Sequence, residues 1–237
     1  MLLFAHTNLR AVLIVFHTLF WAAVGIVVMA LNPTGRLYLW LARRVWSPQV
    51  LRMGGAPLTV KGLENIDPQK SYVVCVNHQS LLDIPVLYAA LPVPIRFLAK
   101  KSLFYIPVFG WSLWLAGYVP VDRSGGKKAR ASLKTAAKRI SNGRSLTIFP
   151  EGTRSPDGEI HNFKSGAFIV AIEAQCPILP VVINGTFELG SKGSLRVNPH
   201  PVQVAVGKPI STTGFAPSDR NKLMTKTRER MLEMRVL

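Results

Sequence analysis

A histidine and a carboxylate stand five residues apart in a segment that could carry general-base chemistry. The segment reads Asn77-His78-Gln79-Ser80-Leu81-Leu82-Asp83 and directly follows an apolar run that ends at Val76. On one continuous helix this spacing would place His78 and Asp83 about 140° apart. The two side chains can therefore meet only if His78 lies in a loop and Asp83 lies in the first turn of a helix. The carboxylate would then hold one ring nitrogen and leave the other to take a proton.

The same residues also allow a purely structural interpretation. Ser80 and Asp83 match the pattern of a helix capping box, in which Ser80 would be the N-cap. This interpretation accounts for Ser80 and Asp83 but gives Asn77 and His78 no purpose. Spacing alone favours neither interpretation.

Three further segments place charged residues where predicted strands end. Residues 149–154 read Phe-Pro-Glu-Gly-Thr-Arg, in which Gly152 allows close backbone approach and Arg154 offers a planar fork suited to phosphate. Residues 117–123 end in Arg123, and Lys101 follows another predicted strand. Each segment, taken alone, could be an ordinary loop with a local ion pair. Because ligands bind at strand ends in α/β sheets, His78, Arg123 and Arg154 together indicate chemistry on a phosphorylated substrate. The five histidines show no metal-ligand spacing.

The elements that must position these residues are short strands alternating with helices. Predicted strands are rich in Val and Ile and bounded by Gly, Pro or Asn; they cover 58–61, 71–76, 96–99, 118–121, 145–149, 178–183 and 202–206. Helical patterns cover about 81–90, 127–141, 164–174 and 218–234. This alternation predicts an α/β fold with a mixed, largely parallel sheet flanked by helices.

The N-terminal region has a different character. Residues 11–31 are almost continuously apolar, which is long enough for a helix to cross a bilayer. A cleaved signal peptide is the competing interpretation, but the apolar run exceeds the usual length and only Arg10 precedes it. Residues 36–52 mix aromatic side chains with arginines, which suits a helix in the headgroup layer. We therefore expect a membrane-associated helix pair in residues 1–54 and a catalytic domain in residues 55–237, on the cytoplasmic side of the membrane.

The net charge of +17 calls for an anionic partner. A strongly basic protein is drawn to nucleic acid, to an anionic membrane, or to acidic substrates and proteins. The 49% hydrophobic content favours the membrane, and no nucleic-acid-binding motif is present. The basic stripe of the helix predicted at 127–141 is either a solvated face or a surface for an acidic carrier protein or the membrane surface.

These blocks, in this order, resemble the glycerolipid acyltransferase family, and specifically its bacterial lysophosphatidic acid acyltransferases. The resemblance covers about residues 60–207. Asn77-His78-x-Ser80-x-x-Asp83 is similar to the first block, residues 117–123 to the second, residues 149–154 to the third and residues 178–182 to the fourth.

The resemblance implies a mechanism and a role for each matching residue. His78, oriented by Asp83, would take the proton of the sn-2 hydroxyl of 1-acylglycerol-3-phosphate, which then attacks the thioester of acyl-CoA or acyl-carrier protein. Arg154, with Arg123 and Lys101, would hold the phosphate. The remaining block residues would shape the substrate site; they are Glu151, Gly152, Thr153, Asn77 and Ser80. No metal or redox cofactor is implied, and the location implied is the inner (cytoplasmic) membrane.

Two alternatives stay open at this point. One is an acyltransferase of the same fold that uses another acceptor, such as a lyso-ornithine lipid or a lysophospholipid. The other is a basic membrane-attached binding protein without catalytic activity, for which replacing His78 would have no effect.

Overall fold

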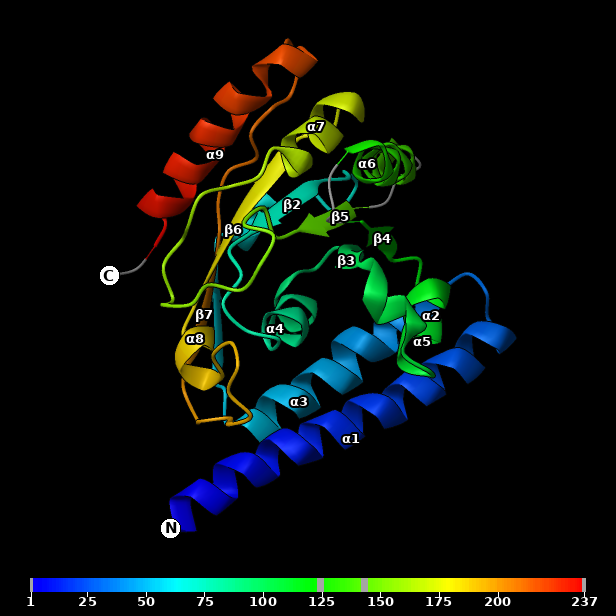
Figure 1. The fold of residues 1–237 in the computed structure, drawn as a ribbon, viewed down its shortest axis with the longest axis vertical. Helices are drawn as coiled ribbons and strands as arrows, with labels where there is room; N and C mark the ends of the chain where they lie inside the picture. The colour runs from blue at the N-terminus through cyan, green and yellow to red at the C-terminus, as the bar shows by residue number, and fades with distance from the viewer. Residues whose placement is uncertain (1, 123–125, 142–144, 236–237) are drawn as a thin grey trace.

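A seven-stranded sheet forms the centre of the molecule, with helices on both of its faces (Figure 1). The computed structural model describes residues 2–122, 126–141 and 145–235. The strands are β1 (Leu58–Lys61), β2 (Val73–Val76), β3 (Ile95–Lys100), β4 (Val119–Val121), β5 (Ser145–Ile148), β6 (Ile178–Asn184) and β7 (Val202–Val206). Their order across the sheet is β1-β7-β6-β2-β5-β3-β4.

The sheet is parallel except at one junction. Strands β6, β2, β5, β3 and β4 run in one direction, whereas β7 pairs with β6 in the antiparallel sense and β1 pairs with β7 in parallel. The carboxyl ends of β2, β5, β3 and β4 therefore meet at one edge. In the sequence, every candidate site residue follows one of these four strands, and two of them, Asp83 and Lys101, are each the first residue of a helix.

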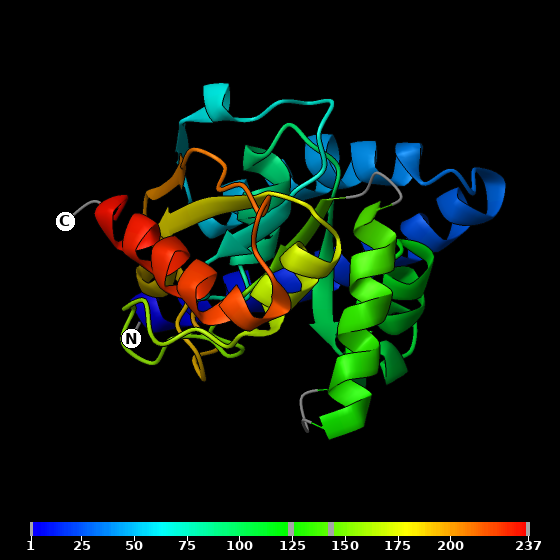
Figure 2. The ribbon, with the colours of Figure 1, turned by 90° about the horizontal axis from the view of Figure 1, so that it is seen from above.

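The helices form two layers. One layer contains α3 (Ser47–Gly54), α4 (Asp83–Ala90) and α5 (Phe109–Leu115), and the other contains α6 (Gly126–Ser141), α7 (Gly166–Glu173) and α9 (Arg220–Glu233). Viewed from above, α9, α7 and α6 lie side by side on their face of the sheet (Figure 2). Short helices complete the chain; they are α2 (Arg36–Leu41), η1 (Ala42–Trp46), η2 (Leu63–Asn65), η3 (Lys101–Tyr105), α8 (Thr186–Leu189) and η4 (Pro217–Asp219).

Strand β2 shows how the sheet is buried. All four of its residues are fully buried, and successive side chains enter opposite cores: Val74 and Val76 face the layer of α4, while Val73 and Cys75 face the layer of α7. A continuous apolar run of this kind is typical of a strand covered on both faces. The burial explains why its sequence does not alternate between apolar and polar residues.

The N-terminal helix α1 (Leu2–Leu31) packs along the outside of the α3 layer (Figure 1). The chain turns at residues 32–35 and returns through α2, η1 and α3 as one nearly continuous helix. Two hydrogen bonds join α1 to the returning helix. Trp21 Nε1 donates to Gln49 Oε1 at 3.2 Å, and Trp46 Nε1 donates to Thr18 Oγ1 at 3.3 Å.

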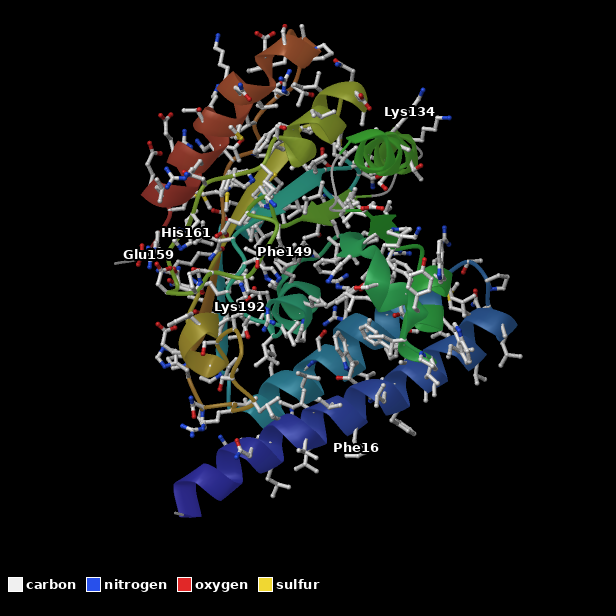
Figure 3. All side chains as sticks on the ribbon, in the orientation of Figure 1. Phe16, Lys134, Phe149, Glu159, His161 and Lys192 are labelled. Carbon is white, nitrogen blue, oxygen red and sulfur yellow. The ribbon has the colours of Figure 1, made fainter. Side chains whose placement is uncertain are left out.

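The outer face of α1 is apolar and open. Phe16 is 67% exposed and Phe20 is 61% exposed, and Phe16 points away from the domain (Figure 3). Residues 8–31 are, among the described residues, the one helical stretch long and apolar enough to cross a membrane. A helix with this outer face is suited to membrane association.

The predicted elements agree with the structure to within a few residues. The predicted strands 58–61 and 202–206 match β1 and β7, and the other five differ by one or two residues at an end. The helix predicted over 127–141 is α6; its Lys134 and Lys138 are exposed, while the side chains of Lys127 and Arg130 lie outside the described residues. Helices α5 and α8 were not predicted.

Candidate active site

His78 and Asp83 are in direct contact at the carboxyl end of β2. His78 Nδ1 lies 2.7 Å from Asp83 Oδ2. His78 is in the loop between β2 and α4, and Asp83 is the first residue of α4, as the spacing required. Asp83 is fully buried, whereas the His78 side chain is 13% exposed. The pair therefore has a buried carboxylate and an imidazole that reaches the surface.

The Asp83 carboxylate also holds the loop that precedes it. Oδ2 accepts hydrogen bonds from the backbone N–H groups of Gln79 at 2.8 Å and Ser80 at 3.0 Å, and Oδ1 accepts one from Thr186 Oγ1 at 2.6 Å. The helix starts later than the capping-box interpretation expected, since Leu82 and not Ser80 is the N-cap. Asp83 nevertheless bonds back to the Ser80 N–H, so the structural role and the contact with His78 coexist.

Because Asp83 Oδ2 is an acceptor, His78 Nδ1 is the donor of their hydrogen bond. This tautomer leaves Nε2 with a lone pair. The imidazole also stacks on Phe149, with ring centroids 3.9 Å apart and planes 15° apart. The stacking and the Nδ1 hydrogen bond together fix the plane of the ring, which is the arrangement of an oriented general base.

Glu151 supports the histidine from the neighbouring strand end. Its Oε1 accepts a hydrogen bond from the His78 backbone N–H at 2.9 Å, and its Oε2 accepts one from the His161 N–H at 3.2 Å. Glu151 is 5% exposed, and burial raises the pKa of its carboxyl above 4.5 although the two N–H donors oppose this shift. The His78 backbone carbonyl is also bonded, because it accepts a hydrogen bond from the Ser155 N–H at 2.7 Å.

Asn77 and Ser80 contact the protein backbone. The Asn77 amide exchanges two hydrogen bonds with Ile183 in β6, at 2.9 and 2.8 Å. Ser80 Oγ donates to the Gly190 carbonyl at 2.5 Å and accepts from the Leu82 N–H at 3.2 Å. Both side chains are thus engaged in holding the loop, and neither is placed as a free substrate ligand.

The third block forms a basic turn beside the histidine. Gly152 has φ +75°, and a Cβ there would come within 3.2 Å of Lys164 Nζ. Lys192 Nζ donates to Thr153 Oγ1 at 3.1 Å (Lys192 is labelled in Figure 3). Arg154 is half-buried in the same turn. Among the described residues, no carboxylate forms an ion pair with Arg154, Lys164 or Lys192.

Two other candidate residues follow β3 and β4. Lys101 is exposed at the start of η3, directly after β3. Arg123 lies outside the described residues, two positions after the end of β4 at Val121. The topology brings the strand end before Arg123 to the same edge of the sheet as the other three.

The structure adds residues that the sequence did not single out. Phe149 stacks on His78, Gln79 Nε2 donates to the Gly158 carbonyl at 2.6 Å, and Thr186 donates to Asp83. Lys164 and Lys192 approach the third block from the segments before α7 and after α8. One signal was available for Thr186, which directly follows the predicted strand 178–183 and its Asn-Gly turn. No group of three or more His, Cys, Asp or Glu suited to a metal ion occurs among the described residues.

Comparison with known proteins places this geometry in a family. The family model described as "Acyltransferase" matches residues 57–184, which include both the His78–Asp83 pair and the third block. The chain belongs to the acyltransferase family.

Named relatives of this acyltransferase come from fungi, plants and animals. The 1-acyl-sn-glycerol-3-phosphate acyltransferase of Saccharomyces cerevisiae is 34% identical over 95% of this chain and 76% of its own length. The coconut (Cocos nucifera) protein of the same name is 36% identical over 76% of this chain, and the mouse alpha form is 35% identical over 75%. This chain spans 54% of the coconut protein and 63% of the mouse protein.

A solved structure shares the whole architecture. The crystal structure of the 1-acyl-sn-glycerophosphate acyltransferase PlsC from Thermotoga maritima has a TM-score of 0.66 and 28% identity with this acyltransferase. The match covers 97% of this chain and 98% of the Thermotoga chain. The likeness therefore includes the N-terminal helices and the sheet.

Proposed function

We propose that this acyltransferase transfers an acyl chain to the sn-2 hydroxyl of 1-acylglycerol-3-phosphate, giving phosphatidic acid for phospholipid synthesis. The observation that carries the proposal is the hydrogen-bonded His78–Asp83 pair beside a basic turn that has no described carboxylate partner. The names of the relatives and of the Thermotoga structure support the choice of acceptor.

In the proposed reaction His78 Nε2 takes the proton of the acceptor hydroxyl. The hydroxyl oxygen attacks the thioester carbonyl carbon and forms the new C–O bond. The tetrahedral intermediate then collapses, the C–S bond breaks, and the thiol leaves with the proton that the imidazolium returns. Asp83 holds Nδ1–H throughout and stabilises the imidazolium. The acyl group passes directly from thiol to alcohol without an acyl-enzyme intermediate.

The phosphate of the acceptor is proposed to bind at the third block. Arg154 offers two parallel donors, Lys164 adds charge next to Gly152, and Lys192 adds charge next to Thr153. Lys101 and Arg123 follow neighbouring strand ends and complete the set. Glu151, Gly152 and Thr153 shape the turn, while Asn77 and Ser80 hold the loop that contains His78.

The acyl donor is proposed to be acyl-CoA or acyl-carrier protein. Both deliver the acyl group as a thioester, so the reaction as written needs no metal or redox cofactor. The exposed lysines of α6, Lys134 and Lys138, offer a surface for an acidic carrier protein. We place the enzyme at the inner membrane with its catalytic domain on the cytoplasmic face, because arginines follow the apolar helix.

The test is acyl transfer by purified protein in mixed micelles. Lysophosphatidate is offered with acyl-CoA and then with acyl-carrier protein, and phosphatidate is measured. His78→Ala is expected to lower turnover by about 10²–10⁴-fold, the usual contribution of a general base. Arg154→Ala is expected to raise KM for lysophosphatidate more than for a lysolipid that lacks a phosphomonoester.

Two outcomes would contradict the proposal in different ways. If native protein is inactive on lysophosphatidate but acylates a lyso-ornithine lipid or a lysophospholipid, the acceptor is wrong and the mechanism stands. If His78→Ala turns over at the native rate, the mechanism is wrong.

A further inference from the structure

The C-terminal helix contacts the loop that follows the third block. Arg228 of α9 donates from Nη2 to the Ile160 carbonyl at 3.1 Å and from Nε to the His161 carbonyl at 3.3 Å. Arg235, just beyond the helix, forms a two-pronged ion pair with the Glu159 carboxylate. Both arginines lie outside the stretch 57–184 that the family model matches. Figure 3 shows Glu159 and His161 in this loop, close to the C-terminal end of α9.

One peptide group joins Arg228 to the candidate base. The carbonyl of the peptide between Ile160 and His161 accepts from Arg228, and the N–H of that same peptide donates to Glu151 Oε2 at 3.2 Å. The other Glu151 oxygen accepts from the His78 backbone N–H at 2.9 Å. The path from Arg228 to His78 thus contains one peptide and one carboxylate.

The Gly158 carbonyl is a second point of contact between this loop and the segment that contains His78. The Gly158 carbonyl accepts from Gln79 Nε2 at 2.6 Å and from Arg235 Nη2 at 3.4 Å. Gln79 directly follows His78, and its own N–H donates to Asp83. The loop 158–161 is therefore bonded to the side chains of Gln79 and Glu151, and it is itself held by Arg228 of α9 and by Arg235 beyond that helix.

The positive charge of Arg228 strengthens the hydrogen bond between the Ile160–His161 peptide and Glu151. A charge-assisted hydrogen bond to a carbonyl polarises the peptide and strengthens the hydrogen bond donated by its N–H. The strengthened donor favours the ionised form of the buried Glu151, whose carboxylate orients the His78 backbone. We propose that Arg228 is a positioning residue for acyl transfer, which acts through the Ile160–His161 peptide and Glu151, with Arg235 as a second anchor of the same loop.

The activity test rests on the function proposed above. Arg228→Met removes both hydrogen bonds and keeps the apolar stem, and Arg230→Met is the matched control because Arg230 is an exposed neighbour that pairs with Glu233. We expect Arg228→Met to lower kcat on the order of tenfold with KM for lysophosphatidate changed by less than about twofold. Arg228→Lys should recover part of the rate, and Arg230→Met should match native enzyme. Equal kcat in the two Met variants would overturn the proposal.

A double-mutant cycle separates this role from general stabilisation. If Arg228 acts through Glu151, its replacement in a Glu151→Gln background should cost much less than in native enzyme. Full additivity of the two losses would overturn the proposed path.

A measurement without substrate keeps the two proposals distinguishable. Amide hydrogen exchange of folded protein in micelles should show the amides of His78 and His161 exchanging at least about fivefold faster in Arg228→Met than in Arg230→Met. Unchanged exchange would refute the positioning role, even if native enzyme makes phosphatidate. If native enzyme makes no phosphatidate, the proposed function fails, and the hydrogen-exchange result alone decides whether Arg228 positions His78. Should Arg228→Met not fold, Arg228→Gln, which keeps a donor and removes the charge, is subjected to the same comparison.

Discussion

Asp83 combines two tasks that sequence patterns present as alternatives. Its carboxylate accepts hydrogen bonds from the His78 ring, from two backbone N–H groups of the loop and from Thr186. The backbone hydrogen bonds hold the loop in the shape that brings the ring to the carboxylate. One side chain therefore builds the turn and orients the base, and replacing it should affect stability and rate together.

Asp83→Asn tests this double role. The amide of Asn would turn an N–H₂ group toward groups that are themselves donors, so buried donors would lose their acceptor. We expect a fall in kcat of about 10²–10⁴-fold, together with about 2–4 kcal/mol of lost unfolding free energy. Acyl-transfer assays and thermal unfolding in micelles measure the two effects. Thr186→Val, which removes one donor and leaves the His78 contact, should lose less than about tenfold in rate.

Glu151 should give the native stability a pH dependence. Burial raises the pKa of its carboxyl in the folded protein above the ordinary value of 4.5. At pH values between 4.5 and the raised pKa of the folded protein, the folded state binds more protons than the unfolded state. In that range this carboxyl makes the free energy of unfolding fall as pH rises. Glu151→Gln removes the titrating group. The unfolding midpoint of Glu151→Gln, measured from pH 4 upward, should fall less steeply with pH than that of native protein. Identical pH dependence in the two proteins would contradict a raised pKa of Glu151.

At the scale of elements, the sequence predicted what depends on local pattern. The strands 58–61 and 202–206 are bounded by glycine and proline and alternate in burial, and they appear as β1 and β7. Helix geometry predicted that His78 must lie in a loop and Asp83 in the first helical turn if the two are to meet, but spacing alone did not predict the contact, which only the family resemblance implied. The position of residues 149–154 at the end of a strand was predictable, because they follow an apolar run that is clearly a strand.

What the sequence missed depends on contacts between distant segments. Thr186 reaches Asp83 only because β6 lies beside β2, which no local pattern reveals. Helix α5 has aromatic residues on its exposed side, so it lacks the polar face that predicts a surface helix. Lys164 and Lys192 likewise lie next to the third block only in the folded chain, so no local pattern predicts their contacts with Gly152 and Thr153.

The short helix α8 owes its position to the glycine that precedes it. Gly185 has φ +90°, and a Cβ there would lie 2.1 Å from the Pro201 carbonyl oxygen. Gly185→Ala should therefore cost about 2–4 kcal/mol of unfolding free energy and displace Thr186, lowering kcat. Gly193→Ala is the control, because Gly193 also has a positive φ of +83° but nothing lies within 4 Å of its Cβ position. That control should cost about 1 kcal/mol and leave kcat unchanged.

At the scale of the whole molecule, the outer face of α1 is the surface offered to lipid. Its exposed side chains are large and apolar, whereas its inner face has buried residues such as Ile14, Ala22 and Met29, and Ile14 belongs to the core shared with α3 and α4. Because the helix packs side-on against the domain, lipid contact along its length brings the domain to the membrane surface.

Phe16→Glu combined with Phe20→Glu tests this contact. Both rings are exposed, so the fold should survive, while the charges oppose insertion into an apolar layer. We expect binding to anionic vesicles to fall at least on the order of tenfold, measured by flotation. Phe16→Leu with Phe20→Leu keeps the apolar face and should bind as native protein does. Retained binding by the Glu variant with native unfolding behaviour would show that lipid contact lies elsewhere.

The strand order also constrains the sequence of events during synthesis. Strand β1 directly follows the N-terminal helices, yet its one partner in the sheet is β7, with Leu58 opposite Val202. While the ribosome is still making the middle of the protein, the apolar helices are already available to lipid and β1 has no strand to pair with. Such distant pairing makes sheet formation slow. The domain therefore completes its sheet late, after its anchor can already have reached the bilayer where the finished enzyme works.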